Sequence, residues 1–415
     1  MTQLEMQGLA AKNASRVLSI AGTAKKNAAL EAIASALEAR QEEILAANLE
    51  DMTAAKAAGM RPSLQDRLAL DGSRIAGIVD GVRQVAALPD PIGETTKMST
   101  RPNGLVIGKR RVPLGVIGII YEARPNVTVD AAALCLKSGN AVILRGGKEA
   151  FHSNQAFVSI MRDALESAGL PRDCVALVTD TTRQSATELM NLTEYLDVLI
   201  PRGGAGLIKN VVEHAKVPVI QTGVGVCHVY VHGEADLDMA ARIIHNAKTS
   251  RPSVCNAAEC LLVDRAVARD FLPMAWQLLQ TKNVELRGCP ETRAILGDFV
   301  VPATEEDWDT EFGDYILAVK VVGGFDEAVE FIHAHGTGHS EAIVTNNYFA
   351  AQQFLDQVDA AAVYVNASTR FTDGNEFGLG AEIGISTQKM HARGPMGLEE
   401  LTSSKFVIYG TGQIR

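Results

Sequence analysis

Hydrophobic residues recur at helical spacing along the first ninety residues of the chain. Residues 24–45 and 63–88 combine this spacing with many Ala, Glu, Lys and Leu side chains, which favour helix. The Pro89-Asp90-Pro91 sequence contains two helix breakers. We therefore expect a helical N-terminal region that ends near residue 88.

Residues 93–112 have a different pattern, which predicts two strands joined by a turn at Pro102-Asn103-Gly104. Residues 405–409, with the sequence Lys-Phe-Val-Ile-Tyr, predict a further strand. An isolated two-stranded hairpin is only marginally stable in water. The hairpin therefore needs a supporting surface, which is either a second subunit or the hairpin's own domain.

From residue 114 onward, predicted strands alternate with predicted helices. The strands are residues 115–121, 141–145, 175–179, 198–201 and 217–221, and the helices are residues 129–137, 151–168, 185–192 and 206–214. Such alternation predicts right-handed β-α-β units and a doubly wound parallel sheet, whose ligands bind at the carboxyl ends of the strands. A second α/β domain is predicted from further strands at residues 260–263, 318–322, 342–345 and 362–365, with helices at residues 266–279 and 327–333.

The chain has 415 residues, which is enough for two or three domains. Its formal net charge of −10 and its 5% aromatic content argue against a nucleic-acid partner. No apolar run reaches the roughly 18 residues that a membrane helix needs, and the first residues lack the pattern of a secretory signal. The six cysteines are too sparse for a disulfide framework and include no C-x-x-C pair, so a cytoplasmic enzyme with reduced thiols fits best.

Several common catalytic motifs are missing from the sequence, including the P-loop, H-E-x-x-H, G-x-S-x-G and a G-x-G-x-x-G that opens a helix. His333, His335 and His339 form the densest histidine cluster. However, Gly336 and Gly338 interrupt a helix there, and no acidic or thiol ligand has zinc-like spacing. We expect no metal site, and we expect these histidines to make local hydrogen bonds or to contact substrate.

Cys255 is the cysteine with the most suggestive surroundings. Cys135, Cys227 and Cys260 lie in apolar runs and are expected to be small buried hydrophobes. Cys255 instead follows a polar stretch of small residues and precedes a predicted strand, at the expected junction of two domains. Arg251 nearby could favour the thiolate. Cys255 is therefore a candidate nucleophile.

The end of the second predicted strand carries two cations, Arg145 and Lys148. In dinucleotide-binding folds a carboxylate at this edge binds the ribose 2′-hydroxyl, whereas a basic side chain accommodates a 2′-phosphate. The two cations point to NADPH over NADH. A solvated basic loop is the alternative interpretation.

These features in this order resemble the aldehyde dehydrogenase superfamily, and more closely its gamma-glutamyl phosphate reductase family. The resemblance extends from the first helices to the C-terminus. It is carried by four motifs and a tail: Val-Pro-Leu-Gly-Val-Ile-Gly at 112–118 with Tyr-Glu-Ala-Arg-Pro-Asn at 121–126, Ser-Gly-Asn-Ala-Val-Ile-Leu-Arg-Gly-Gly at 138–147, Ser-Arg-Pro-Ser-Val-Cys-Asn at 250–256, His-Gly-Thr-Gly-His-Ser-Glu at 335–341, and Arg-Gly-Pro-Met-Gly-Leu at 393–398. Two positions depart from the family pattern, because Phe331 replaces a histidine and Lys148 stands where serine is common.

The resemblance implies an aldehyde dehydrogenase-like fold of two doubly wound α/β domains with an oligomerisation arm. The implied divisions are a cofactor-binding domain at residues 1–92 and 113–225, a catalytic domain at 226–375, an arm at 93–112 and 395–415, and a return segment to the cofactor domain at 376–394.

The implied reaction is the NADPH-dependent reduction of L-glutamyl 5-phosphate to glutamate 5-semialdehyde and phosphate, a step of proline biosynthesis. Cys255 would form a thioester, and Asn126 would help to hold the oxyanion. The implied cofactor residues are Arg145, Gly146, Lys148, Gly203, Gly204, Glu311 and Phe312. Arg370 and Ser368 would bind the substrate, although a structural salt bridge is an equal alternative for Arg370. The implied partners are other copies of the chain and, transiently, the glutamate kinase that makes the substrate.

Residues 219–223 carry no carboxylate, whereas hydrolytic aldehyde dehydrogenases have a glutamate base in this segment. An enzyme that must protect its thioester from water has no use for such a base. Two alternatives remain, namely another acylating or hydrolytic aldehyde dehydrogenase and a non-catalytic oligomeric relative.

Overall fold

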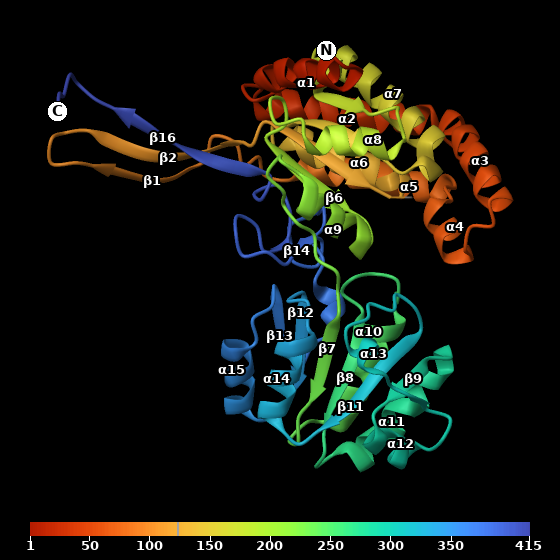
Figure 1. Cartoon of the computed structure of the whole chain (residues 1–415). Helices are drawn as coiled ribbons and strands as arrows, with labels where there is room; N and C mark the ends of the chain where they lie inside the picture. Colours follow the sequence, from red (N-terminus) through yellow and green to blue (C-terminus); the bar gives the residue numbers. More distant parts are fainter. Residues whose placement is uncertain (123) are drawn as a thin grey trace. The chain divides into compact units, whose positions relative to one another are not determined.

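The computed structural model describes residues 1–122 and 124–415, so Ala123 in the motif at 121–126 lies outside the described residues. The chain forms two compact units (Figure 1). The first unit consists of Met1–Thr222, Gly378–Gly384 and Met396–Arg415, and the second of Gly223–Phe377 and Ile385–Pro395. The segment between 376 and 394, predicted as a return to the cofactor domain, is thus shared between the two units.

A four-stranded parallel sheet forms the centre of the first unit, in the order β5-β4-β3-β6. Its strands are β3 (Val116–Tyr121), β4 (Ala141–Arg145), β5 (Val175–Leu177) and β6 (Val198–Arg202). All six residues of β3 are buried, as expected for a strand covered on both faces. The order reverses between β3 and β6, and the carboxyl ends of these two strands are where an open α/β sheet binds its ligands.

The described part of the first unit also contains nine α-helices. They are α1 (Gln3–Leu18), α2 (Thr23–Ala39), α3 (Gln41–Ala57), α4 (Pro62–Leu68), α5 (Gly72–Ala87), α6 (Pro125–Lys137), α7 (Phe151–Ser167), α8 (Arg183–Met190) and α9 (Ala205–His214). The predictions of single helices over 24–45 and 63–88 were wrong. The backbone leaves the helical region at Arg40, and the Asp71 carboxylate caps a new helix by accepting from the Arg74 N–H.

The predicted strand at residues 217–221 is reduced to one bridge between Leu199 and Val219. Pro218 explains part of this difference, because proline has no N–H to donate to a strand ladder. Leu199 instead donates to the carbonyl oxygen of Pro218, and Ile220 donates to that of Leu199.

The second unit contains a seven-stranded parallel sheet in the order β10-β9-β11-β8-β7-β12-β13. The strands are β7 (Cys227–Val231), β8 (Ala258–Asp264), β9 (Glu285–Gly288), β10 (Val301–Pro302), β11 (Ile316–Val322), β12 (Ser340–Val344) and β13 (Ala362–Val365). The helices are α10 (Leu237–Thr249), α11 (Ala268–Leu279), α12 (Pro290–Leu296), α13 (Glu305–Trp308), α14 (Phe325–His335) and α15 (Tyr348–Gln357).

Alternate residues of these strands enter two separate cores. Val229 of β7 and Leu261 of β8 pack with α10 and α11, whereas Tyr230 of β7 and Leu262 of β8 pack with α14 and α15. The sheet is therefore covered by helices on both faces (Figure 1).

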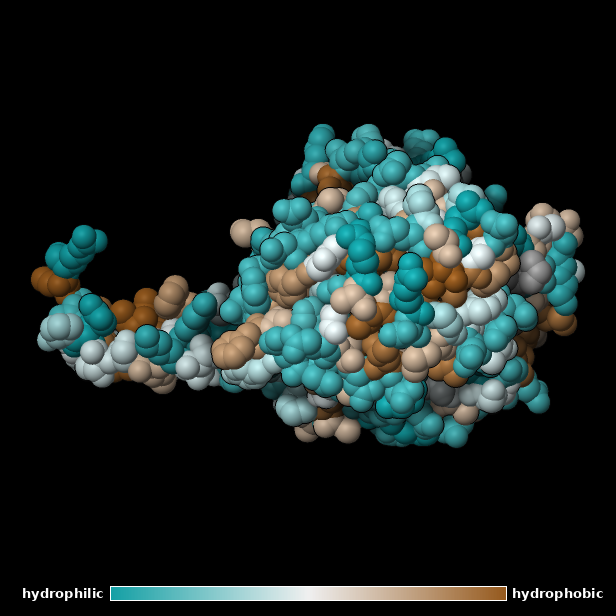
Figure 2. All heavy atoms as spheres, turned by 90° about the horizontal axis from the view of Figure 1, so that it is seen from below, coloured by the Kyte–Doolittle hydropathy of each residue, from teal (hydrophilic) through white to brown (hydrophobic). Residues whose placement is uncertain are grey.

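A separate antiparallel sheet, which we call the arm, projects from the helices of the first unit (Figure 1). It consists of β1 (Thr95–Thr100), β2 (Val106–Pro113) and β16 (Thr402–Tyr409) in the order β1-β2-β16. The predicted hairpin and the predicted C-terminal strand thus support each other. Hydrophobic side chains remain exposed on the arm (Figure 2), including Met98, Phe406, Ile408 and Tyr409.

The segment after β13 adds β14 (Ile385–Ser386) and β15 (Gly394–Pro395), which pair with each other. None of the helices in residues 1–122 and 124–415 is long and apolar enough to cross a membrane.

Candidate active site

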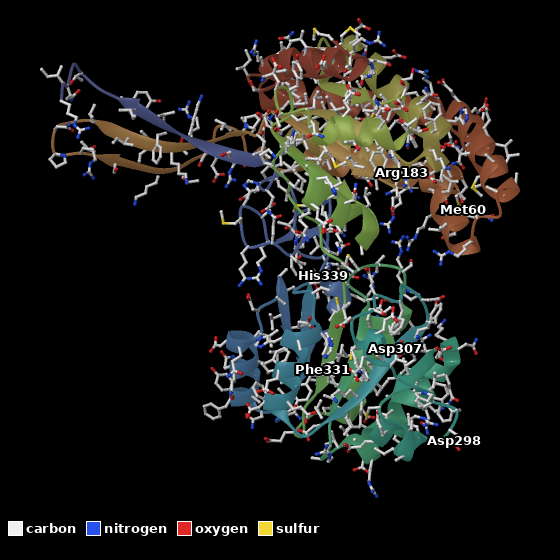
Figure 3. The ribbon with its side chains drawn as sticks, in the orientation of Figure 1. Met60, Arg183, Asp298, Asp307, Phe331 and His339 are labelled. Carbon is white, nitrogen blue, oxygen red and sulfur yellow. The ribbon has the colours of Figure 1, made fainter. Side chains whose placement is uncertain are left out.

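The order of the second sheet brings three separate sequence segments to one edge. β8, β7 and β12 are adjacent in the sheet. Cys255 lies in the turn before β8, Cys227 begins β7, and His339 immediately precedes β12. Figure 3 labels His339 in this unit. The candidate nucleophile therefore lies at the amino edge of this sheet, not at the carboxyl edge where the ligands of such sheets usually bind.

Cys255 is half-buried in a turn that is closed by a 3.0 Å hydrogen bond from the Ala257 N–H to the Val254 carbonyl. Gly225 lies against this turn so closely that a Cβ atom there would come within 1.5 Å of the Cys255 carbonyl oxygen. Only glycine can occupy position 225 without displacing the turn.

Asn256, the residue after Cys255, is held by residues 369–372, which are distant in the sequence. The Thr369 hydroxyl donates to the Asn256 carbonyl oxygen at 2.7 Å, and the Asn256 amide donates to the Thr372 carbonyl at 2.8 Å. The guanidinium of Arg370 donates to the Asn256 side chain. These bonds fix the backbone that follows the candidate nucleophile.

Arg370 and Ser368 make contacts within the protein. Besides its bond to Asn256, Arg370 donates from Nε to the Ser250 hydroxyl at 3.0 Å. Burial, reinforced by the Arg251 guanidinium, lowers the pKa of Arg370. Ser368 is buried and accepts a hydrogen bond from the Arg370 N–H. Substrate binding by these two residues stays a prediction.

A buried ion pair joins β8, the strand after the Cys255 turn, to the segment that carries Glu311 and Phe312. Lys248 of α10 lies 2.5 Å from Glu259 of β8, and Glu259 also accepts a hydrogen bond from the Gly313 N–H at 3.2 Å. Burial lowers the pKa of Lys248 and raises that of Glu259 to about 7.

Phe312 borders a cavity of about 490 Å³ whose wall includes Arg287 and Asp307, the latter labelled in Figure 3. The Arg287 guanidinium lies 5.1 Å from the centre of the Phe312 ring, and it donates to Asp307 at 2.6 Å. The Phe312 ring is therefore fixed by a cation–π contact.

In the first unit, the two predicted cofactor cations differ in their surroundings. Arg145 donates to the carbonyl oxygens of Thr181 and Thr182, at 2.8 and 2.9 Å, and burial lowers its pKa. Lys148 is exposed. Gly146 packs tightly, since a Cβ there would meet the Asn154 amide at 2.2 Å. Lys148 is thus the more exposed of the two cations.

At the carboxyl ends of β3 and β6, Glu122 accepts a hydrogen bond from the Gly204 N–H at 3.0 Å. This carboxylate caps α9, whose N-terminus favours anions. A Cβ at Gly203 would lie 2.7 Å from the carboxylate carbon of Glu122. The predicted glycines Gly203 and Gly204 therefore lie beside the N-terminus of α9, where the Glu122 carboxylate is bound.

Asn126, the predicted oxyanion residue, is the second residue of α6 and donates to Asp130 at 2.9 Å. Burial raises the pKa of Asp130 to about 6, against the opposing effects of Asn126 and Arg202. Asn126 belongs to the first unit and Cys255 to the second. The proposed joint action of these two residues stays a prediction.

Comparison with known proteins assigns the family. The model of the aldehyde dehydrogenase family matches residues 3–293. The chain is 61% identical over 413 residues to the gamma-glutamyl phosphate reductase of Halothermothrix orenii, covering 100% of this chain and 99% of that protein. It is 62% identical to that of Carboxydothermus hydrogenoformans, covering 98% and 97%. The chain belongs to the aldehyde dehydrogenase family.

Solved structures agree with this assignment. The gamma-glutamyl phosphate reductase of Thermotoga maritima has a TM-score of 0.97 at 51% identity and covers all of both chains. An acetylating aldehyde dehydrogenase from Geobacillus thermoglucosidasius, at 19% identity and a TM-score of 0.70, shares the fold. The aldehyde dehydrogenase-like fold and the resemblance to gamma-glutamyl phosphate reductases are therefore confirmed.

Several contacts of this aldehyde dehydrogenase family member were not predicted from the sequence. They include Glu122 on Gly204, the Lys248–Glu259 pair, Gly225 against Cys255, and the contacts of Cys227 and His339. One usable signal was present, because Lys248 and Glu259 are charged residues within otherwise apolar helix and strand faces. His333 is bonded to the Gln357 carbonyl and His335 to Asp309, partners that are distant in the sequence, and contact of these histidines with substrate stays a prediction.

Proposed function

We propose that the chain catalyses the NADPH-dependent reduction of L-glutamyl 5-phosphate to L-glutamate 5-semialdehyde and phosphate in proline biosynthesis. The observation that carries this proposal is full-length identity of about 60% to proteins named gamma-glutamyl phosphate reductase. The half-buried Cys255, fixed in a turn, supplies a suitable nucleophile.

In the proposed reaction, the Cys255 thiolate attacks the acyl carbon and forms a C–S bond. Backbone N–H groups of the turn stabilise the oxyanion. The bond from carbon to the phosphate oxygen then breaks, and phosphate leaves with the electron pair. The resulting thioester accepts a hydride on its carbonyl carbon. The C–S bond then breaks, which releases the aldehyde and restores the thiolate.

NADPH is the proposed cofactor, and it supplies that hydride when bound. Two features of the first unit support a phosphate-bearing dinucleotide. The N-terminus of α9 favours anions, as its hydrogen bond to the Glu122 carboxylate illustrates, and a Cβ at Gly204 would meet only that carboxylate, at 3.9 Å. Lys148 is proposed to bind the 2′-phosphate, and Arg145 to hold the loop beside it through Thr181 and Thr182. Contact of Glu311 and Phe312 with the nicotinamide ribose is part of the same proposal.

The arm is proposed to join copies of the chain into a homo-oligomer, because its hydrophobic side chains are exposed in the single chain. All six cysteines lack disulfides, which supports a cytoplasmic location. Transient contact with the kinase that produces the labile acyl phosphate is a further proposal.

A hydrolytic activity is the main rival, and the absence of a carboxylate from residues 219–223 weighs against it. The deciding experiment follows NADP⁺ reduction by glutamate 5-semialdehyde with and without inorganic phosphate. We expect a strict requirement for phosphate and loss of activity in Cys255→Ser. Turnover without phosphate would favour the hydrolytic enzyme, and no turnover at all would favour a non-catalytic relative.

A further inference from the structure

The motif at residues 335–341 contains two side chains that the proposed reaction leaves without a role. Thr337 and His339 precede β12, which lies directly beside β7. Thr337 and His339 therefore lie beside the start of β7 at Cys227 and beside the two preceding residues, Gly225 and Val226. The same β7 segment lies against the turn that carries Cys255.

A chain of contacts connects this motif to the candidate nucleophile. The Thr337 hydroxyl accepts a hydrogen bond from the Val226 N–H at 3.1 Å. His339 Nδ1 lies 2.8 Å from the Ser340 hydroxyl and 3.7 Å from the Cys227 sulfur. The Cys227 sulfur in turn lies 3.2 Å from the carbonyl oxygen of Cys255, with geometry for an S–H donor. The glycine at 225 permits this close approach of the two backbones.

Cys227 is suited to donate a hydrogen bond but not to act as a second nucleophile. It is fully buried, and burial together with the Glu341 carboxylate raises the pKa of its thiol well above the usual value. The thiol therefore keeps its proton and can donate a hydrogen bond to the Cys255 carbonyl oxygen. His339 is also fully buried, and burial lowers the pKa of His339 to about 4. Its imidazole is thus neutral and provides no cation to stabilise a thiolate at Cys227.

The contact acts on the peptide that follows the nucleophile. Peptides are planar and trans, so a carbonyl oxygen of Cys255 that points to Cys227 directs the N–H of Asn256 to the opposite side. An N–H group next to the nucleophile is the type of donor that stabilises an oxyanion in acyl transfer. Asn256 is held from its other side by Thr369 and Thr372.

We propose that Cys227, braced by Thr337 and His339, is a positioning residue that fixes the Cys255–Asn256 peptide in the orientation needed for oxyanion stabilisation. This inference rests on the proposed role of Cys255. It gives the motif at 335–341 a function that is distinct from substrate contact.

The test uses the full-length protein and three variants. Cys227→Ala removes the donor, and Cys227→Ser retains one. Cys260→Ala is the matched control, because Cys260 is equally buried and lies on the adjacent strand β8.

Two reactions of Cys255 are compared in each of these proteins. Acylation by p-nitrophenyl acetate, measured as the burst of nitrophenolate, builds an oxyanion, whereas alkylation by iodoacetamide, measured by peptide mass spectrometry, does not.

Loss of one hydrogen bond corresponds to about a 5-fold slower burst in Cys227→Ala. We expect kcat of the phosphate-dependent reaction to fall by a similar factor in Cys227→Ala, with KM unchanged. Cys227→Ser and Cys260→Ala should stay within about 2-fold of the wild type. Alkylation of Cys255 should be unaffected in all three variants. An unchanged burst in Cys227→Ala would overturn the proposal. Equal losses of acylation and alkylation would also overturn it, because Cys227 would then act on the thiol or on the integrity of the turn.

A second variant covers the case in which Cys227→Ala does not fold. Thr337→Val removes the acceptor for the Val226 N–H without changing either thiol, and it is expected to slow the burst but not the alkylation. A normal burst in folded Thr337→Val would contradict the proposed brace. Since neither reagent requires glutamyl phosphate or NADPH, a wild-type protein that is acylated at Cys255 but inactive in the phosphate-dependent assay would refute the proposed function alone.

Discussion

Lys248 and Glu259 form an ion pair that is removed from solvent, with 2.5 Å between Nζ and Oε2. The other carboxylate oxygen of Glu259 accepts the N–H of Gly313. The pair therefore connects α10, β8 and the segment containing Glu311 and Phe312. A buried charge that loses its partner is costly, although the intact pair need not be stabilising.

Lys248→Met leaves the Glu259 carboxylate buried without its cation. We expect the free energy of unfolding to fall by about 3–5 kcal/mol, measured by urea denaturation. The double variant Lys248→Met/Glu259→Leu is expected to recover most of that loss. Arg265→Met, which breaks an exposed pair with Glu291, is the control and should cost less than about 1 kcal/mol. A double variant no more stable than the single one would contradict this account.

The lowered pKa of His339 leads us to expect that the protein loses stability as the pH falls. Burial lowers its folded-state pKa to about 4, whereas an unfolded histidine titrates near 6.5. As the pH falls from about 6.5 to about 4, the unfolded chain binds a proton that the folded chain does not, so stability is lost by up to about 3 kcal/mol. Urea midpoints at pH 7 and pH 5 should therefore differ less in His339→Gln than in the wild type. The exposed His214→Gln is the control, and an unchanged difference in His339→Gln would count against the prediction.

Gly225→Ala tests the contact between this residue and the Cys255 turn. The added Cβ would overlap the Cys255 carbonyl oxygen, so the turn must move. We expect a loss of about 1–3 kcal/mol in stability and a strong fall in the rate of Cys255 acylation. Gly77→Ala in α5, where a Cβ meets nothing within 4 Å, should leave acylation unchanged. A fully active Gly225→Ala protein would show that the turn is not constrained there.

Lys148→Glu tests the proposed recognition of the 2′-phosphate. Replacing an exposed cation by an anion should raise KM for NADPH about 10-fold and change KM for NADH little, because NADH lacks that phosphate. Steady-state kinetics with both nucleotides measure the change. Lys56→Glu on α3, also exposed, is the matched control. Parallel increases for both nucleotides would point to a general electrostatic effect.

Phe406→Asp tests the proposed interface. Phe406 is 70% exposed on β16, and Ile408 two residues later is 60% exposed on the same face of the strand. A charge there should lower the molar mass measured by light scattering coupled to size exclusion. Ser404→Asp, also exposed on β16, introduces the same charge nearer the base of the arm as a control. If neither variant alters the mass, the arm is not the site of association.

The strongly periodic elements were predictable from the sequence, because burial on a strand or helix repeats at a fixed local spacing. Helix breaks at Arg40 and Asp71 depend on single residues within continuous helical patterns and were missed. Cys255 stood out through its polar surroundings. Cys227 did not, since its local sequence is that of a core strand, and burial was correctly expected. Its contact with Cys255 depends on the adjacency of β7, β8 and β12, which local patterns do not determine.

The arm has a consequence for how the protein matures on the ribosome. β2 pairs along its whole length with β16, and the two strands are separated in the chain by residues 114–401, which include the whole of the second unit and part of the first. Chain segments emerge in sequence order, so β2 leaves the ribosome long before the strand that completes its sheet. A chain whose translation stops before residue 402 retains the Cys255 turn but exposes an open strand edge. Completion of the arm therefore distinguishes chains that include β16 from chains that are interrupted before it.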